Sequence, residues 1–486
     1  MKKNVLLNFF VQIITYLTPF ILSPYLSRVL MPSGIGEYSF GNSIAYYFSI
    51  IIIFGFTNYG TKKISSNRQN KKEYSHHFWS IFFARLIFGL LSIFSYVLLL
   101  NLNLFSDKIH QYIYYSLILL LVADIMDISY LFQGLEEFSI ASISNLVVNI
   151  GYMMLVFFLV KTEEDLFIYS FLKSGIKLAY SLILWCFAWK KLNAPVINYR
   201  SVLQVFKNSF LFFLPGLVMT LNQSLDILML GSLSNTCETG YYEQVHKIVA
   251  LVCSLIYAIG PILLSRISFL YSIKDEEEIK KKVAKLFRFT LLIILPACIG
   301  LYIIAPIFVP LYFGNDFIPA IDVMYCFIPE ILFSCVSSII INSYFYPTGN
   351  TSKCTIVVSF TTILNFLLNL WFIKNLGAMG AALASSISGF MQLVLLLIFS
   401  IKKVDYLFIL RGSWKIVFSS ILMGALTFFI NRLLLLTNLN YFYVTIIDIL
   451  CGGLFYFCFC ILFKEEFLKE SVTIIINKIK KLLRKE

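Results

Sequence analysis

The chain is dominated by long runs of apolar residues, each bounded by a short polar break. A helix that crosses a membrane needs about 20 predominantly apolar residues, and runs of this length are typical of such helices. The pattern therefore predicts an all-α integral membrane protein with about fourteen transmembrane helices. The predicted spans lie near 5–30, 38–61, 77–101, 111–133, 138–160, 166–189, 208–232, 241–268, 286–313, 321–347, 354–374, 379–401, 414–436 and 441–463.

The composition excludes an ordinary soluble enzyme. Of the 486 residues, 59% are hydrophobic and 13% are charged, whereas soluble domains are about 45–50% apolar and about 25% charged. No connection between spans is long enough for a catalytic domain, and no GxxxxGK[ST] phosphate loop occurs. The ten cysteines lie mostly inside apolar runs and lack metal-binding spacing. We therefore expect a protein that is not an enzyme and that has no metal or cofactor.

The formal net charge of +13 is explained best by membrane orientation. Most of the 39 lysines and arginines fall in the connections on one side of the predicted membrane, such as Lys62, Lys63 and Arg68 after the second span. Basic residues accumulate on the cytoplasmic side of membrane proteins, so both termini are predicted to be cytoplasmic. Because these residues do not form one soluble basic face, nucleic acid is not expected as a partner.

A weak internal repeat predicts two six-helix lobes. Asn145 and Asn149 follow a polar turn in the first half, and Asn365 and Asn369 follow a similar turn in the second half. Transporters built from such parallel repeats place their substrate between the two halves. The predicted parts are an N-terminal lobe at 1–189, a cytoplasmic linker at 190–207, a C-terminal lobe at 208–401, two additional helices within 402–463 and a basic tail at 464–486, which is either an amphipathic helix on the inner leaflet or a solvated segment.

An ordered series of short motifs carries a family resemblance. The series is PYLSRVL at 24–30, GIGEYSF at 34–40, QGLEE at 133–137, NQSLDILMLG at 222–231, TGYYEQVHKI at 239–248, YFGNDF at 312–317, PTGN at 347–350 and GAMGAALA at 377–384. It resembles the bacterial polysaccharide transporter family, the flippases of O-antigen and capsule repeat units. That family lies within the superfamily that also holds multidrug-and-toxin extruders and lipid II flippases.

The resemblance implies a fourteen-helix fold of two lobes plus two extra helices in the bacterial cytoplasmic membrane. The implied cargo is an oligosaccharide repeat unit on undecaprenyl diphosphate, moved from the cytoplasmic to the outer leaflet by alternating access through a cationic central cavity. Membrane lipids and polysaccharide polymerase or assembly proteins are the implied partners. An ion-coupled multidrug or cation antiporter of the same superfamily is the alternative; such a protein is expected to favour an acidic cavity.

Basic residues inside the spans are the candidate contacts to an anionic cargo, because a charge facing lipid costs at least about 2.5–3.5 kcal/mol. Lys173 and Lys177 are four residues apart and share one helix face. A diphosphate would relieve their repulsion, and snorkelling or pairing with acids is the alternative. Arg28 suits phosphate or an interfacial anchor, and Lys247 suits cargo or a local ion pair with Glu243.

Acidic residues inside the spans are the candidate sites of coupling to H⁺ or Na⁺. Asp226 lies near the middle of the seventh span, where a buried carboxylate would be protonated or paired with a cation. Asp124 and Asp127 are predicted to share a face of the fourth span, and Glu330 follows a proline in the tenth. A structural salt bridge to a cavity lysine is the alternative role for Asp226.

Asn365 and Asn369 form a polar stripe on the eleventh predicted span. Their amides suit contact with sugar hydroxyls, and hydrogen bonding between helices is the alternative.

Overall fold

The structure is a computed structural model that describes the backbone of residues 2–102, 110–195, 198–258, 260–273, 275–401, 404–437 and 439–463. Side chains are described from Thr18 onward, except at some positions within 211–223 and 261–265. The predicted tail at 464–486 lies outside the described residues. The helices are α1 (Lys2–Ile53), α2 (Phe56–Ser66), α3 (Lys71–Asn101), α4 (Gln111–Met126), α5 (Ser129–Gly134), α6 (Phe138–Leu159), α7 (Leu166–Ala188), α8 (Tyr199–Leu233), α9 (Thr236–Tyr257), α10 (Gly260–Ser272), α11 (Glu276–Phe313), α12 (Ala320–Ile340), α13 (Thr351–Ser400), α14 (Tyr406–Leu410), α15 (Ser413–Leu435) and α16 (Tyr441–Leu462), with short helical turns at Glu163–Asp165, Asn315–Phe317 and Ile341–Phe345.

The predicted all-α membrane fold is confirmed for the part of the chain that the structure describes, which contains no strand. Ten helical segments there are long and apolar enough to cross a membrane. Two of them, Thr18–Ser66 and Thr351–Ser400, have 49 and 50 residues, which is enough for two crossings each. The predicted number of about fourteen helices is roughly consistent with the helices of the described residues.

Several predicted breaks between spans are kinks within continuous helices. Met31, with φ 57° and ψ 172°, interrupts α1 where a loop was predicted. Gly377, with φ 58°, interrupts α13 in the same way. Conversely, the predicted second span breaks at Gly55 (φ 72°), and the predicted spans 111–133 and 241–268 are each divided into two helices. These differences arise because hydropathy marks membrane depth and says little about backbone direction.

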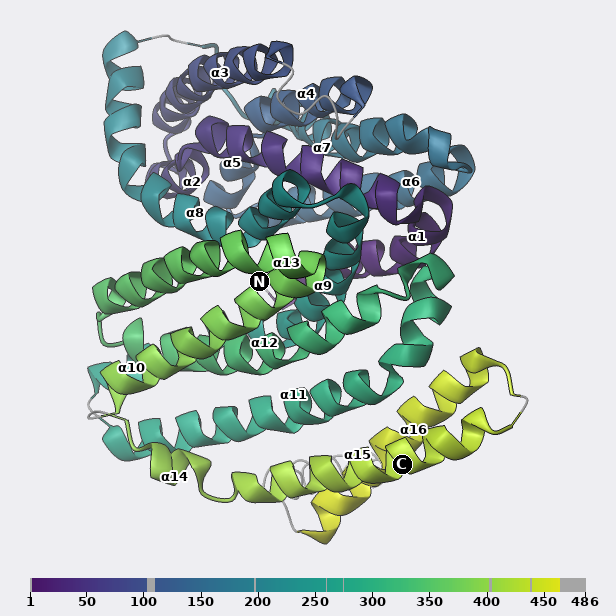
Figure 1. The fold of residues 1–486 in the computed structure, drawn as a ribbon. Coiled ribbons are helices and arrows are strands. Elements are labelled where there is room, and N and C mark those ends of the chain that lie inside the picture. The colour runs from purple at the N-terminus through teal and green to yellow at the C-terminus, as the bar shows by residue number, and fades with distance from the viewer. Residues whose placement is uncertain are drawn as a thin grey trace, which may run out of the picture. The chain divides into compact units, whose positions relative to one another are not determined.

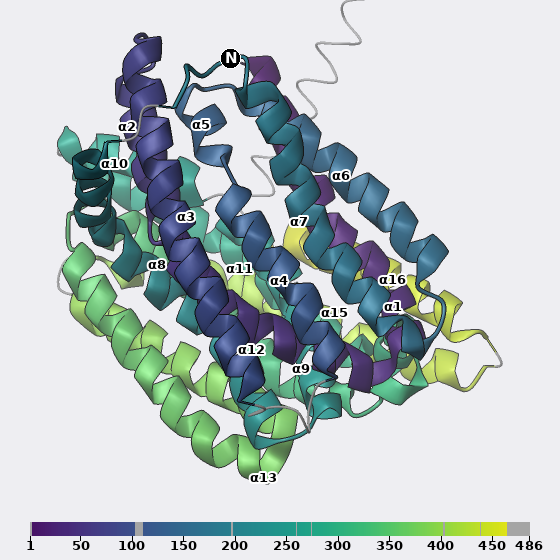
Figure 2. The ribbon, with the colours of Figure 1, turned by 90° about the horizontal axis from the view of Figure 1, so that it is seen from above.

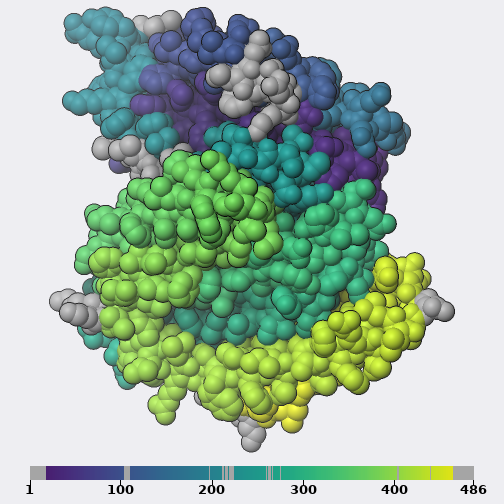
Figure 3. All heavy atoms as spheres, in the orientation of Figure 1, coloured from purple at the N-terminus to yellow at the C-terminus, as the bar shows by residue number. Residues whose placement is uncertain are grey.

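The chain divides into two compact units, Met1–Gln244 and Val245–Glu486. In the first unit, α3, α4, α7 and α6 lie side by side in that order (Figure 2). In the second unit, α11 packs between α12 and the pair α15–α16 (Figure 1), and side chains fill the space between these ribbons (Figure 3). The predicted lobes place their boundary at 190–207, whereas the first unit also includes α8 and the start of α9. The repeat itself stays a prediction.

Two glycines allow α1 and α9 to approach within the first unit. A Cβ atom added to Gly36 would lie 1.7 Å from the carbonyl oxygen of Thr236, and one added to Gly240 would lie 2.1 Å from that of Pro32. Pro32 lies four residues before Gly36, and Thr236 lies four residues before Gly240. Each glycine therefore contacts the helical turn that precedes the other glycine. Small residues at this spacing allow close packing of membrane helices.

Polar side chains extend the same contact between α1 and α9. Gln244 is 1% exposed; its Oε1 accepts a hydrogen bond from Ser23 Oγ at 2.5 Å, and its Nε2 donates to Ser27 Oγ at 2.9 Å. A buried amide without partners would be costly, so Gln244 and the two serines also fix the relative position of the helices. This contact brings together residues of the PYLSRVL, GIGEYSF and TGYYEQVHKI motifs.

We predict that Gly36→Ala and Gly240→Ala each lower the thermal unfolding midpoint of the full-length protein in detergent. Each added methyl group meets a backbone oxygen that cannot rotate away, and overpacking of this kind costs about 1–3 kcal/mol. Gly151→Ala in α6 is the matched control, because its Cβ would meet nothing within 4 Å. Equal midpoints for Gly240→Ala and Gly151→Ala would contradict the close contact.

Candidate functional site

Four ionisable side chains on or next to α3, α4 and α7 form two ion pairs inside the first unit, which together are called the ionic network below. Its members are Arg85, Asp124, Asp127 and Lys177. Arg85 and Asp124 are each only 1% exposed. Since a buried charge is strongly destabilising without a partner, the geometry of the two ion pairs decides what this network can do.

Asp124 and Lys177 join α4 to α7. Lys177 Nζ lies 2.5 Å from Asp124 Oδ1, and the lysine side chain is 36% exposed. The other carboxylate oxygen, Oδ2, is buried and has no hydrogen-bond partner among the described residues. The sequence left open whether Lys177 pairs with an acid, and the structure shows that it does. This pair combines a buried carboxylate with a cation that reaches a more exposed region.

Arg85 of α3 binds the end of α4. Its Nη1 donates to the carbonyl oxygen of Asp127, its Nη2 lies 3.7 Å from Asp127 Oδ2, and Nη2 also donates to Thr57 Oγ1 at 3.3 Å. The Asp127 carboxylate accepts a hydrogen bond from Ser129 N at 2.9 Å.

The predicted shared face of Asp124 and Asp127 stays a prediction. α4 ends at Met126, and Asp127 has the extended backbone angles φ −69° and ψ 113°. Asp127 is thus the residue that directly follows α4 and leads to α5, whereas Asp124 lies within the helix.

The other predicted cations, Lys173, Arg28 and Lys247, have different surroundings. Lys173 lies one turn before Lys177 on α7, with its Nζ 5.1 Å from the centre of the Tyr152 ring of α6, a cation–π contact. Arg28 is exposed and donates to the Pro24 carbonyl of its own helix at 2.9 Å. Lys247 is half-buried on α9 in the second unit. Only Lys173 and Lys177 are therefore shown on neighbouring turns of one helix.

The remaining predicted acids are also held by their surroundings. Asp226 is 8% exposed and accepts a hydrogen bond from Tyr242 Oη at 2.5 Å. Glu330 of α12 lies against Gly389 of α13, where an added Cβ would be 1.8 Å from Glu330 Oε2. Gly389 thus provides the space for this carboxylate, a role that the sequence analysis did not identify.

Asn365 and Asn369 form hydrogen bonds between helical segments, which was the alternative to contact with sugar hydroxyls. Asn369 Nδ2 donates to Asn365 Oδ1 at 3.1 Å, and Asn365 Nδ2 lies 3.4 Å from the hydroxyls of Ser385 and Ser388. These serines belong to the half of α13 that follows the kink at Gly377. The asparagines therefore join the two halves of this helix.

Sequence reasoning missed a further buried acid. Glu37 is 9% exposed, and its Oε1 accepts hydrogen bonds from His110 N at 2.6 Å and from His110 Nδ1 at 2.7 Å. Its position within the GIGEYSF motif was the available signal. In the part of the chain that the structure describes, no group of three His, Cys, Asp or Glu side chains is placed to hold a metal.

Comparison with known proteins identifies the family. Residues 1–264 match the family described as "Polysaccharide biosynthesis protein". The chain belongs to this family. The resemblance predicted from the ordered motifs is thereby confirmed at the level of this family.

Two relatives of the chain share one name. It is 23% identical over 272 residues to a "Putative O-antigen transporter" of Escherichia coli (strain K12), covering 55% of this chain and 65% of that protein. It is 24% identical over 324 residues to a protein of the same name from Shigella dysenteriae, covering 65% of this chain and 79% of that protein. The chain thus spans just under two thirds of the length of the first of these relatives.

A solved structure shares the fold of this chain. The structure described as "Lipid II flippase MurJ, inward closed conformation" matches with a TM-score of 0.69 and 19% identity, covering 93% of this chain and 99% of that chain. The likeness extends over nearly the whole chain and shows a common fold.

We predict that the two single substitutions that break the Asp124–Lys177 pair lower the stability of the protein by different amounts. Lys177→Gln leaves a buried carboxylate unpaired, whereas Asp124→Asn leaves a lysine that reaches solvent. Lys177→Gln should therefore lower the thermal unfolding midpoint more. Removal of one partner from a fully buried pair costs about 3–5 kcal/mol of stability. The loss in Lys177→Gln should be smaller, because Lys177 is partly exposed.

The double variant Asp124→Asn/Lys177→Gln should regain most of the midpoint lost in Lys177→Gln, since no charge remains unpaired. Strictly additive effects of the two single changes would argue against a coupled pair.

Proposed function

We propose that this protein translocates oligosaccharide repeat units linked to undecaprenyl diphosphate from the cytoplasmic to the outer leaflet of the bacterial cytoplasmic membrane, for O-antigen or capsule synthesis. The observation that carries the proposal is the family match over residues 1–264. The names of the two relatives and the fold shared with a lipid II flippase support it. The positions of Lys173 and Lys177 on neighbouring turns of α7 suit an anionic headgroup.

The Asp124–Lys177 pair supplies a mechanism for coupling cargo to a cation. When a cargo diphosphate takes Lys177 as its partner, the buried Asp124 carboxylate loses its counter-charge. Asp124 then takes up a proton, or a Na⁺ ion, because an unpaired charge is not stable at that depth. Cargo and cation thus stabilise the same rearranged state, and such differential binding is what shifts a conformational equilibrium in alternating access.

The setting of this function follows from the charge distribution. Both termini face the cytoplasm, where the basic connections interact with anionic lipids. Polysaccharide polymerase or assembly proteins receive the translocated unit. Transport requires no organic cofactor and no ATP; the energy comes from an ion gradient or from removal of the product outside.

Deletion of the gene tests the transport function. We expect undecaprenyl-diphosphate repeat units to accumulate in the inner leaflet and surface polysaccharide to be lost, as measured by analysis of lipid-linked intermediates and of surface glycan. Complementation with the intact gene should restore both. Unchanged surface polysaccharide together with altered dye efflux would instead support the cation antiporter.

Substitution of the α7 lysines tests their role in cargo binding. We expect Lys173→Gln/Lys177→Gln to fail to restore surface polysaccharide in the deletion strain, because the diphosphate loses both cationic partners. Lys161→Gln is the control, since Lys161 is exposed just beyond the end of α6 and its Nζ donates to the Phe157 carbonyl oxygen. Asp124→Asn/Lys177→Gln separates stability from function, because it should be stable and still inactive. Full activity of that variant would remove Lys177 from the proposed site.

A further inference from the structure

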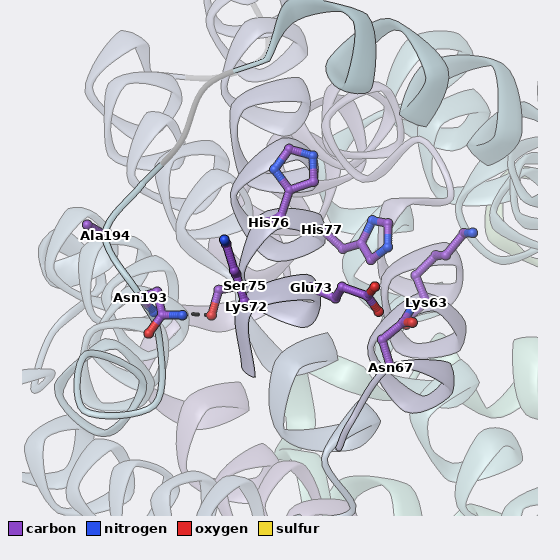
Figure 4. A pocket seen from close by; sticks show the side chains of 9 residues that line it. All are labelled: Lys63, Asn67, Lys72, Glu73, Ser75, His76, His77, Asn193 and Ala194. Atoms are coloured by element: carbon purple, nitrogen blue, oxygen red, sulfur yellow. Dashed lines mark hydrogen bonds between the residues drawn. The ribbon is translucent and has the colours of Figure 1, made fainter. Parts of the chain in front are cut away.

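A pocket of about 800 Å³ opens at one end of the first unit, which the basic connections predict to face the cytoplasm. It lies between the end of α2, the start of α3 and the segment that follows α7 (Figure 4). Its volume is within the range of about 300–1,000 Å³ that is usual for small-molecule sites. The side chains that matter for its chemistry are Lys63, Asn67, Lys72, His76, His77 and Asn193.

The walls of the pocket are held in place by hydrogen bonds and aromatic packing. Asn193 N donates to Ser75 Oγ at 3.1 Å (Figure 4), and Trp79 Nε1 donates to the Asn193 carbonyl at 2.9 Å. His76 Nε2 lies 3.1 Å from Ser201 Oγ of α8. The buried core cluster beneath α3 includes Trp79. These contacts attach the segment around Asn193 to α3 and keep the pocket preformed.

The two lysines of this pocket differ from two basic residues close to it. Arg68 forms an ion pair with Glu136, and Lys191 Nζ lies 2.7 Å from Glu137 Oε1. Lys63 and Lys72 form no ion pair with any carboxylate in the part of the chain that the structure describes. Membrane orientation explains why basic residues occur in this connection. Membrane orientation does not require that lysines without an ion pair, such as Lys63 and Lys72, line a pocket.

The polar groups of the pocket suit a phosphate group. Two ammonium groups supply charge, and imidazole and amide N–H groups supply further donors to oxygen. The dipole of the 31-residue helix α3 adds positive potential at its start. Asn70 Oδ1 already accepts hydrogen bonds from Lys72 N and Glu73 N, so direct contacts to a ligand come from side chains. Glu73 is the acidic residue among the lining side chains.

We propose that this pocket binds a phosphate or diphosphate group, presented either by a membrane lipid or by a soluble molecule. The site is distinct from the ionic network, because His77 and Arg85 are eight residues apart on α3, which is about 12 Å along the helix axis. It goes beyond the proposed transport function, since phosphate binding here does not depend on translocation.

The test is a calorimetric titration of the full-length protein with inorganic diphosphate in nanodiscs made only of phosphatidylcholine. We expect saturable binding that weakens about tenfold or more in Lys63→Gln/Lys72→Gln, because two charge-assisted contacts are lost. Lys63→Arg/Lys72→Arg should retain binding. Arg68→Gln/Lys191→Gln is the matched control with the same change in net charge, and it should stay within about twofold of the original protein, since its cations already have partners.

A second titration identifies the source of the phosphate. If lipid headgroups occupy the pocket, diphosphate should bind more weakly in nanodiscs that also contain phosphatidic acid, and this difference should vanish in Lys63→Gln/Lys72→Gln. If the natural ligand is soluble, affinity should be the same in both kinds of nanodisc.

Absence of saturable binding in phosphatidylcholine nanodiscs, or equal affinity of the Lys63→Gln/Lys72→Gln and Arg68→Gln/Lys191→Gln variants, would overturn the proposal. Flippase activity is measured independently in the deletion strain, so a failure of the pocket and a failure of the transport function are distinguishable.

Discussion

A charge buried at membrane depth must find its partner inside the protein, and the first unit depends on how it meets this requirement. Asp124 is almost inaccessible, and Lys177 compensates it from the neighbouring helix. Arg85, equally buried, is held by the backbone and carboxylate of Asp127. These contacts connect α3, α4 and α7. Because lipid offers no alternative partners, a ligand that disrupts one of these pairs must itself supply a partner for the buried charge.

Close approach of backbones is the second constraint on the first unit. Gly36 and Gly240 leave no room for a side chain between α1 and α9, and Gln244 satisfies its amide with Ser23 and Ser27. Apolar side chains do not drive helices together in lipid, where the surroundings are equally apolar. Small residues and internal hydrogen bonds therefore determine which helices pack. The short motifs of this sequence contain residues that form this contact.

The basic residues of the first unit fall into three physical classes. Many are predicted from their distribution alone to orient the chain in the membrane. A second class, represented by Lys177 and Arg68, is already neutralised by acids. The third class consists of Lys63 and Lys72, which line a preformed pocket without an ion pair in the described part of the chain. Net charge does not separate these classes, because the difference lies in what each side chain touches.

The sequence by itself determined the helical class, the approximate spans and the family, because hydropathy and motif order are properties of the linear chain. It also identified Lys177 and Asp124 as charges at membrane depth. Only the tertiary structure decided that these two form a pair, that Asp127 lies beyond the end of α4, and that Asn365 and Asn369 join the halves of a kinked helix. Helical periodicity assigns a side chain to a face, but its partner depends on which helix packs there and on where the backbone turns, as at Met31 and Gly377. Those choices arise from packing between distant segments, which local sequence does not encode.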